Sequence, residues 1–286
     1  MGMNKREVAK LITRIENGSE REVEAILKKV KKGKTIFVGI TGSAGSGKST
    51  AVNALTKELL KRGKKIGVVA VDPSSPLSGG AILGDRIRMN GGVDDRVFFR
   101  SVATRGMKSI SKSTGAIARV LSSRGCDIVF IETVGSGQED FEIAAISDLA
   151  LLVLNPGMGD SIQMIKSGVI EIADGFVLNK SDMNSCLLTY NLLRENFPEK
   201  QIFKTISTEN KGIKEVADFI ESWKGNSREK KRKITEKLLS SLIKDRMFED
   251  ALKNGDLREK YEKLINEIAD GKMDLYEALL KMKNLM

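Results

Sequence analysis

Short apolar runs alternate with longer amphipathic segments through the middle of the chain, from about residue 34 to residue 224. The runs that read as buried strands are Thr35–Ile40, Ile66–Val71, Val97–Phe99, Ile128–Ile131, Leu149–Leu154, Phe176–Leu178 and Ile202–Ile206. Several of them are almost continuously apolar, which is typical of a parallel sheet covered by helices on both faces. The pattern therefore predicts an open, mostly parallel α/β sheet, in which ligands bind at the carboxyl ends of the strands.

Two amphipathic helices are predicted ahead of this sheet, within residues 1–33. The apolar positions of the first recur at helical spacing and stop before Gly18: Val8, Leu11, Ile12 and Ile15. Ser19 and Glu22 have the spacing of a capping box, which opens a second helix with the apolar positions Val23, Ile26, Leu27 and Val30. We expect a helical hairpin that packs on the sheet domain.

Residues 225–286 are predicted to form a helical extension. The segment begins with the basic stretch Arg228–Lys233 and continues with apolar residues at helical spacing: Ile234, Leu238, Leu242, Ile243, Leu257, Tyr261, Leu264, Ile265, Ile268, Leu275 and Leu279. Thin helical extensions bury an apolar stripe poorly on their own. Two interpretations stay open, a helical cap on the sheet and a dimerisation arm. The predicted organisation is thus 1–33, 34–224 and 225–286.

Composition and charge narrow the class of protein. Of the 286 residues, 41% are hydrophobic and 30% charged, which is ordinary for a globular protein long enough to bury a core. The formal net charge of +10 permits an anionic partner, but a lysine-rich solvated surface is the preferred interpretation. Three Tyr and one Trp, with no basic run interleaved with aromatic residues, do not favour a single-strand binder. We expect no nucleic-acid partner.

Cys126 and Cys186 are the two cysteines, and the chain has no histidine. Two distant cysteines predict neither a disulfide framework nor a zinc site. The lack of histidine removes the commonest metal ligand and the usual acid–base side chain. No stretch is long and apolar enough to cross a membrane, and the charged start Met1–Arg6 is not a secretory signal. We expect a cytoplasmic protein with no membrane partner.

The strongest motif follows the predicted strand Thr35–Ile40 and opens a helix whose apolar positions begin at Val52. It has the phosphate-loop pattern and comprises Gly42, Ser43, Ala44, Gly45, Ser46, Gly47, Lys48, Ser49 and Thr50. Glycines let backbone N–H groups turn toward phosphate oxygens, and the helix N-terminus adds its positive end. Lys48 would then reach the β- and γ-phosphates, while the Ser49 hydroxyl would bind Mg²⁺.

A second motif, Asn179–Asp182, comes directly after the predicted strand Phe176–Leu178. The Asp182 carboxylate can accept two hydrogens from guanine, whereas adenine presents an acceptor and no amino group there. Lys180 would lie along the base plane and brace the phosphate loop. The motif predicts GTP and GDP as ligands, and the expected guanine-binding residues are Asn179, Lys180, Asp182 and, more weakly, Ser207 and Thr208.

Acidic residues stand near the ends of the predicted strands. Asp72 follows Ile66–Val71, Glu132 follows Ile128–Ile131, and Asp85 follows a Gly-Gly pair. An isolated strand-end Asp is usually a loop or helix cap, but three carboxylates that converge on one phosphate site favour binding of Mg²⁺, which prefers oxygen ligands. One of them could also orient or deprotonate the attacking water. The expected metal ligands are Ser49, Asp72, Asp85 and Glu132.

Three further features bear on catalysis. Gly135, in the loop after Glu132, could hold the γ-phosphate through its N–H and release it after hydrolysis. The loop Asn155–Asp160 has glycines that permit mobility, although a simple turn would look the same. Arg86 and Arg88 could stabilise transition-state charge, with surface arginines as the blander alternative. The expected catalytic residues are Lys48, Arg88 and Glu132.

With these residues assembled, the chain resembles the MeaB/ArgK/MMAA family of G-protein chaperones for adenosylcobalamin-dependent methylmalonyl-CoA mutase. The matching blocks are Gly39–Thr50, Ala70–Ser75, Gly79–Met89, Glu132–Gln138, Pro156–Asp160 and Asn179–Asp182. The Glu at the end of the fourth predicted strand and the Val-Asp-Pro-Ser-Ser stretch are specific to this group. The chain departs from the family pattern at Pro76–Ser78 and Arg100–Lys112, which leaves another cobalamin mutase open as the client.

The resemblance implies a GTP hydrolase with a helical N-terminal extension and a C-terminal arm used in homodimerisation. It implies that GTP binding and hydrolysis are coupled to cofactor loading or protection of the mutase. It also implies that Glu132–Gln138 is a switch, that Gly157–Lys166 is a second, partner-sensing loop, and that Arg88 stabilises charge. The family's label as an arginine/ornithine transport kinase is set aside, because the sequence indicates no second substrate pocket.

Two other functions remain alternatives. A GTPase for nickel-enzyme maturation would share the fold and the Mg²⁺ site, but such proteins usually carry Cys/His metal sites. A basic nucleic-acid-binding GTPase would draw only on the net charge. An ATP-driven kinase is opposed by Asn179–Asp182.

Overall fold

The computed structural model describes residues 5–30, 33–72, 94–103, 111–133, 142–143, 146–156, 169–225 and 228–283. By its internal contacts the chain divides into two compact units, Met1–Ile234 and Thr235–Met286. Within the described residues, no helix combines the length and the apolar character needed to span a bilayer.

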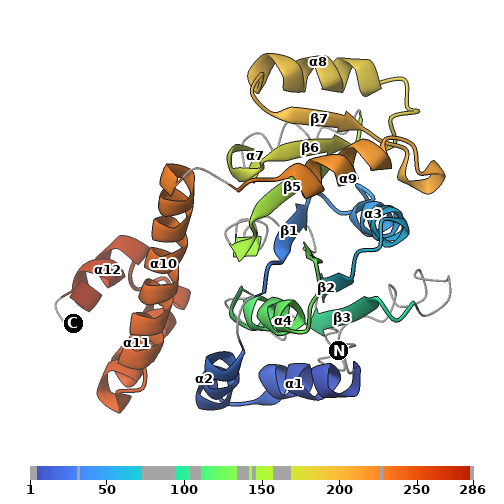
Figure 1. Ribbon diagram of the computed structural model, residues 1–286. Helices are drawn as coiled ribbons and strands as arrows, with labels where there is room; N and C mark the ends of the chain where they lie inside the picture. The colour runs from blue at the N-terminus through green and yellow to red at the C-terminus, as the bar shows by residue number, and fades with distance from the viewer. Residues whose placement is uncertain are drawn as a thin grey trace. The chain divides into compact units, whose positions relative to one another are not determined.

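The first unit is built on a seven-stranded, all-parallel sheet with the strand order β3-β2-β4-β1-β5-β6-β7 (Figure 1). The strands are β1 (Ile36–Thr41), β2 (Ile66–Asp72), β3 (Val97–Ala103), β4 (Ile128–Glu132), β5 (Leu149–Leu154), β6 (Gly175–Leu178) and β7 (Gln201–Lys204). Each predicted apolar run corresponds to one strand. The predicted α/β fold class is confirmed.

Two strands end two or more residues away from the prediction, while the other boundaries agree to within one residue. β3 continues beyond Phe99 to Ala103, because its ladder with β2 runs as far as the pair Asp72 and Ala103. β7 ends at Lys204, before the predicted end at Ile206. Ile206 instead forms an isolated antiparallel bridge with Lys211. Both differences lie in the edge strands, where the apolar pattern of the sequence is weakest.

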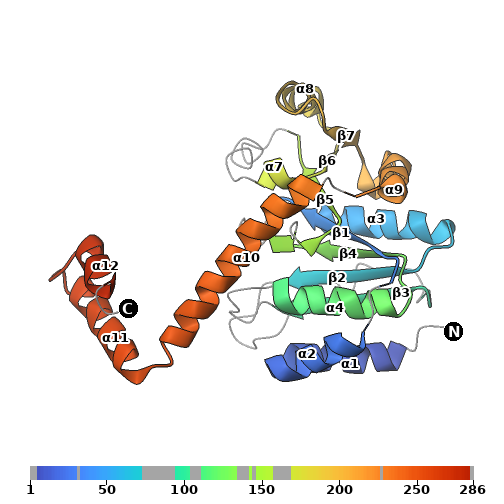
Figure 2. The same cartoon turned by 60° about the vertical axis from the view of Figure 1, so that its left-hand side comes forward.

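Helices cover both faces of the sheet, as Figures 1 and 2 show. Successive strand residues point to opposite faces, so Val38 packs with α3 (Lys48–Lys61) and α9 (Ile213–Ser222). Phe37 packs with α4 (Ser111–Ser123) on the opposite face. On that second face, Leu152 and Leu154 pack with α8 (Cys186–Asn196). The short segments α7 (Val169–Ile172) and η2 (Ser207–Glu209) complete this unit.

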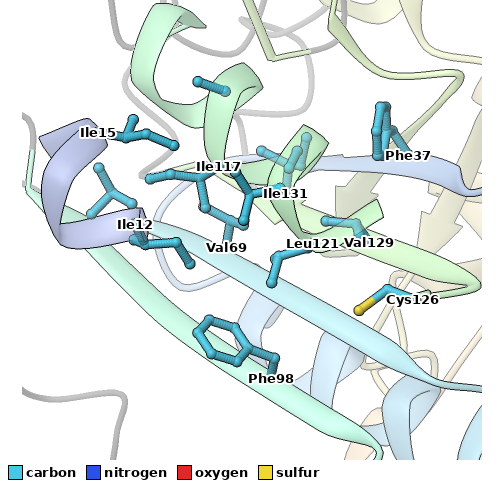
Figure 3. Close-up of a cluster of buried hydrophobic side chains, with 14 of the residues drawn as sticks. Ile12, Ile15, Phe37, Val69, Phe98, Ile117, Leu121, Cys126, Val129 and Ile131 are labelled. Carbon is cyan, nitrogen blue, oxygen red and sulfur yellow. The ribbon is translucent and has the colours of Figure 1, made fainter. Parts of the chain in front are cut away.

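The N-terminal helices α1 (Lys5–Asn17) and α2 (Glu20–Lys29) form as predicted. The capping box is present: Glu22 N–H donates to Ser19 Oγ over 3.4 Å, and Ser19 N–H donates to Glu22 Oε2 over 3.0 Å. Ile12 and Ile15 of α1 enter the cluster that also contains Ile117 of α4 (Figure 3). The hairpin therefore shares one apolar core with the sheet.

The second unit consists of helices. α10 (Arg228–Ala251) begins in the first unit and continues into the second, followed by α11 (Gly255–Ala269) and α12 (Leu275–Lys283). Its buried cluster is small and consists of Leu264, Met273 and Ala278, with Ile268 partly buried. Exposed large apolar side chains are numerous in comparison: Leu239, Ile243, Met247, Ile265, Leu275, Tyr276, Leu279 and Leu280.

Candidate functional site

The predicted site residues that the structure describes lie at the carboxyl ends of the strands, because parallel strands all end on the same side of the sheet. The phosphate loop joins the end of β1 to the start of α3. Glu132 is the last residue of β4 and pairs with Ile40 of β1 and Ala70 of β2. The segment Asn179–Asp182 follows β6 directly. Strands thus bring together motifs that are far apart in the sequence.

The glycines of the phosphate loop are needed for conformation and for space. Gly47 caps α3 with φ 93°, in the left-handed region that favours glycine. A Cβ on Gly47 would lie 2.3 Å from Asn179 Nδ2, and a Cβ on Gly42 would lie 2.2 Å from the Val153 carbonyl oxygen. The loop can approach β5 and the segment after β6 this closely only because neither residue has a side chain.

Lys48 closes the loop on itself. Its Nζ donates to the carbonyl oxygens of Gly42 over 2.8 Å and Ser43 over 3.0 Å. The side chain is buried although it carries a charge. A buried ammonium needs such partners, and here they hold it against the loop at the N-terminus of α3, where anions bind favourably.

Ser49 and Glu132 form the oxygen-rich part of the site. Ser49 Oγ donates to Glu132 Oε1 over 2.5 Å, and the Glu132 side chain is buried. A hydroxyl and a carboxylate in contact are hard oxygen donors of the kind that Mg²⁺ takes in small number, alongside water and phosphate. The two residues fit that ion. The described residues alone contain no group of three or more His, Cys, Asp or Glu side chains that could hold a metal.

Asn179 links three parts of the site through its amide. Nδ2 donates to the Ser46 carbonyl oxygen in the phosphate loop over 3.1 Å. Oδ1 accepts from Thr205 Oγ1 over 3.2 Å, and from Ser207 N and Oγ over 3.1 and 2.8 Å. This buried side chain therefore fixes the phosphate loop against the segment that follows β7.

Lys180 and Asn155 both donate to the preceding carbonyl of the loop, that of Gly45. Lys180 Nζ donates to the Gly45 carbonyl oxygen over 2.9 Å, and Asn155 Nδ2 donates to the same oxygen over 3.1 Å. Lys180 has φ 55°, which is uncommon for a residue with a side chain. No role for Asn155 is predicted from the sequence. The signal available was a polar residue placed directly after the buried strand β5.

Asp182, two residues after Lys180, is exposed and interacts electrostatically with Lys211. The side-chain hydrogen bond to Glu209, assisted by the field of Asp182, raises the pKa of Lys211 above its usual value. Ser207 is buried while Thr208 is exposed. Because Ser207 N–H is engaged by Asn179, it points into the protein and not toward a ligand.

Several predicted residues fall beyond the part of the chain that the structure describes. They are Asp85, Arg88 and Gly135, together with Arg86 and the segments 134–138 and 157–166 that were predicted as switches. Asp72 is described as the last residue of β2, without its side chain. The roles of these residues stay predictions.

Comparison of the sequence with known proteins identifies the family of this chain. The family model described as "Methylmalonyl Co-A mutase-associated GTPase MeaB" matches residues 8–256. A Pyrococcus abyssi protein named as a GTPase is 40% identical in an alignment of 299 positions that covers 96% of this chain and 91% of that protein. The mouse protein "Methylmalonic aciduria type A homolog, mitochondrial" is 39% identical over 180 residues, covering 62% of this chain and 43% of its own length.

A solved structure shares the fold. The crystal structure of an LAO/AO transport system kinase superposes with a TM-score of 0.63 and covers 100% of this chain and 99% of its own. The sequence identity is 20%, so the likeness concerns the fold alone.

Proposed function

The chain belongs to the MeaB family of methylmalonyl-CoA mutase-associated GTPases, and on this premise we propose that it uses GTP and Mg²⁺ to assist an adenosylcobalamin-dependent mutase. Membership makes the chain a P-loop GTPase, which binds guanine nucleotide and hydrolyses GTP. The proposal adds the residues that do this, the metal ion and the client enzyme.

One observation carries the nucleotide part of the proposal. Asn179 and Lys180, which belong to the proposed guanine-reading segment, donate directly to the Ser46 and Gly45 carbonyls of the phosphate loop. The two segments are thus held at a fixed separation, as a ligand with a base at one end and phosphates at the other requires. Asp182 reads guanine, and the Thr208 N–H is the donor left for the guanine oxygen, since Ser207 N–H is engaged.

The phosphate end is assigned to the loop and the helix it opens. The N–H groups of Gly42–Thr50 surround the phosphate oxygens, and Lys48 places its charge beside the β- and γ-phosphates. Ser49 and Glu132 hold Mg²⁺, with Asp72 and Asp85 as further ligands. When bound, Mg²⁺ supplies positive charge that offsets the charge of these phosphates. We assign the orientation of the attacking water to Glu132, the hold on the γ-phosphate to Gly135 N–H, and the stabilisation of transition-state charge to Arg88.

The client part of the proposal rests on the family match over residues 8–256. We assign the mutase as the partner whose cofactor loading or protection is coupled to the GTP cycle. The test is GTP hydrolysis by the purified protein, alone and with methylmalonyl-CoA mutase from the same source, with ATP as the control substrate. We expect the mutase to raise the rate of GTP hydrolysis and ATP to remain unhydrolysed.

The variant Lys48→Ala supplies the background rate, because it removes the charge that spans the phosphates. If the mutase changes neither the rate nor the affinity for GTP, the client assignment is wrong while the GTPase activity stands. The same assay with another cobalamin mutase, or with a nickel enzyme, then tests the alternatives. Salt-sensitive binding to nucleic acid would support the last alternative, a basic nucleic-acid-binding GTPase.

We also propose that the chain forms a homodimer through its second unit. Exposed apolar side chains outnumber buried ones in that unit, and Leu275, Tyr276 and Leu279 are 76%, 69% and 65% exposed. Apolar surface of this kind marks interaction sites. Leu279→Glu should convert the dimer into a monomer in sedimentation velocity, whereas Glu277→Gln on the same helix should not. A monomeric parent protein would contradict the proposal.

A further inference from the structure

Asn155 occupies a position that the nucleotide chemistry alone does not explain. It follows the last residue of β5, is 3% exposed, and donates from Nδ2 to the Gly45 carbonyl oxygen over 3.1 Å. The second donor to this oxygen is Lys180 Nζ, at 2.9 Å, which comes from the end of β6. Two strands thus contribute one donor each to a single carbonyl of the phosphate loop.

The conformation of the loop at Gly45 depends on these hydrogen bonds. Gly45 has φ 76°, and no atom lies within 4 Å of the place where a Cβ would stand. Side-chain packing therefore does not restrain this residue on that side. Because the peptide unit is planar, fixing the Gly45 carbonyl also fixes the direction of the Ser46 N–H. The donors to Gly45 therefore set the orientation of the peptide in the middle of the loop.

The end of β5 contacts the loop at a second point. The Val153 carbonyl oxygen lies so close to Gly42 that a Cβ there would approach it to 2.2 Å. At the carboxyl end of β5, Val153 thus lies against the first residue of the loop, and Asn155 forms a hydrogen bond to its middle. Of the two donors to the Gly45 carbonyl oxygen, Lys180 carries a positive charge, whereas Asn155 is neutral and buried. The contribution of Asn155 is therefore positional.

We infer that Asn155 is a positioning residue for GTP hydrolysis. It acts through the Gly45 carbonyl and holds the phosphate loop in the conformation in which the backbone N–H groups face the phosphates. It does not touch the nucleotide. The inference rests on the proposed assignment of this loop to the phosphates of GTP.

The test compares variants of Asn155 that differ in hydrogen-bonding chemistry. Asn155→Ala removes the donor and should lower kcat/KM for GTP roughly two- to tenfold, as expected for the loss of one hydrogen bond. Asn155→Asp places an acceptor against the Gly45 oxygen and should lower it further at pH 7.5. As the pH falls and this carboxyl gains a proton, it becomes a donor, so the ratio to wild-type activity should rise.

The matched control is Asn196→Ala. Asn196 Nδ2 also donates to a backbone carbonyl, that of Leu192, over 2.8 Å, at the exposed end of α8. This variant should keep the wild-type kcat/KM. The midpoint of thermal unfolding of each variant shows whether the fold is intact, and the pH-dependent recovery of Asn155→Asp is a result that general destabilisation would not produce.

Two outcomes separate the inference from the proposal on which it rests. If Lys48→Ala abolishes GTP binding while the Asn155 variants match the wild type at every pH, Asn155 has no positioning role and the phosphate site stands. If Lys48→Ala binds GTP normally, the loop does not hold the phosphates and both assignments fall.

Discussion

The Ser49 hydroxyl donates a hydrogen bond of 2.5 Å to Glu132 Oε1, although the two residues lie 83 positions apart in the chain. The bond joins the first turn of α3 to the carboxyl end of β4, next to the pairing of Glu132 with Ile40. Two oxygens suited to Mg²⁺ are therefore already in contact at the proposed phosphate end of the site. Little side-chain rearrangement is needed to assemble them.

This contact leads to a prediction about metal dependence. Ser49→Ala should raise the concentration of Mg²⁺ that gives half-maximal GTP hydrolysis, because one of the proposed protein ligands is lost. Glu132→Gln should have a larger effect, since it removes a full negative charge as well as a ligand oxygen. Initial rates measured against MgCl₂ concentration test both.

The control is Ser123→Ala, because Ser123 Oγ donates to the Val120 carbonyl oxygen in α4, away from the site. It should show the wild-type Mg²⁺ dependence. If the Ser49 and Glu132 variants share that dependence, neither residue binds the metal.

Asp182 offers a test of base recognition. The carboxylate of Asp182 is assigned to the ring N–H and amino group of guanine, so Asp182→Asn should bind GTP more weakly and lose most of the preference for GTP over ATP. An Asn side chain can donate to a carbonyl, so the variant should gain affinity for xanthosine triphosphate, which has a carbonyl in place of the amino group. Competition of the three nucleotides against labelled GDP measures this. A variant that still prefers GTP over ATP would sink the assignment.

The sheet was predictable from the sequence because its central strands are continuous apolar runs. Leu149–Leu154 is buried along its whole length in the structure and was delimited correctly. β3 was predicted too short because Arg100 and Ser101 interrupt the apolar pattern. β3 is an edge strand, and Arg100 pairs with Glu16 of α1, so this charged side chain is satisfied outside the ladder. Such a partner, contributed by a distant helix, leaves no local signal.

The residue types of the site were predictable, and their mutual contacts were not. The motifs identify Gly47 and Asn179, but the amide of Asn179 reaches the loop across 133 positions of sequence. Asn155 reaches Gly45 across 110 positions. These contacts depend on the strand order that places β1 beside β5 and β5 beside β6, and periodicity along the chain does not determine which strands become neighbours.

Cys126 should resist alkylation in the folded protein. Burial raises the pKa of the Cys126 thiol to about 12, and the charge of Asp127 adds to this while Lys65 opposes it. At pH 8 the folded protein therefore keeps the thiol protonated, whereas the unfolded chain has a pKa of about 8.5. Iodoacetamide at pH 8 should label Cys126 only after unfolding in urea, as measured by peptide mass spectrometry.

The same shift predicts how stability depends on pH. A pKa raised in the folded state means that the folded protein holds the proton more tightly, so this contribution is complete below about pH 8.5 and is lost as the pH rises toward 12. The free energy of unfolding should fall less steeply between pH 8.5 and 11 in Cys126→Ala than in the wild type. Equal slopes, or rapid labelling of Cys126 in the folded protein, would show that the thiol is not shielded.

Gly45 and Gly47 form a matched pair for testing why the phosphate loop needs glycine. Both have positive φ, 76° and 93°, so an Ala at either position costs about 1 kcal/mol in backbone conformation. They differ in space: a Cβ on Gly45 would meet no atom within 4 Å, whereas one on Gly47 would lie 2.3 Å from Asn179 Nδ2. Gly47→Ala must therefore displace Asn179, and with it the link between the phosphate loop and the guanine segment.

The expected result is a modest loss of GTP affinity in Gly45→Ala and a loss at least tenfold larger in Gly47→Ala, measured by titration with a fluorescent GTP analogue. Thermal unfolding should show both variants folded, because neither glycine supports the apolar core. The ratio of GTP to ATP affinity should also fall in Gly47→Ala, since displacement of Asn179 disturbs the segment that carries Asp182. Equal losses in the two variants would mean that backbone conformation alone accounts for the glycines, and that the approach of Asn179 to Gly47 does not matter for binding.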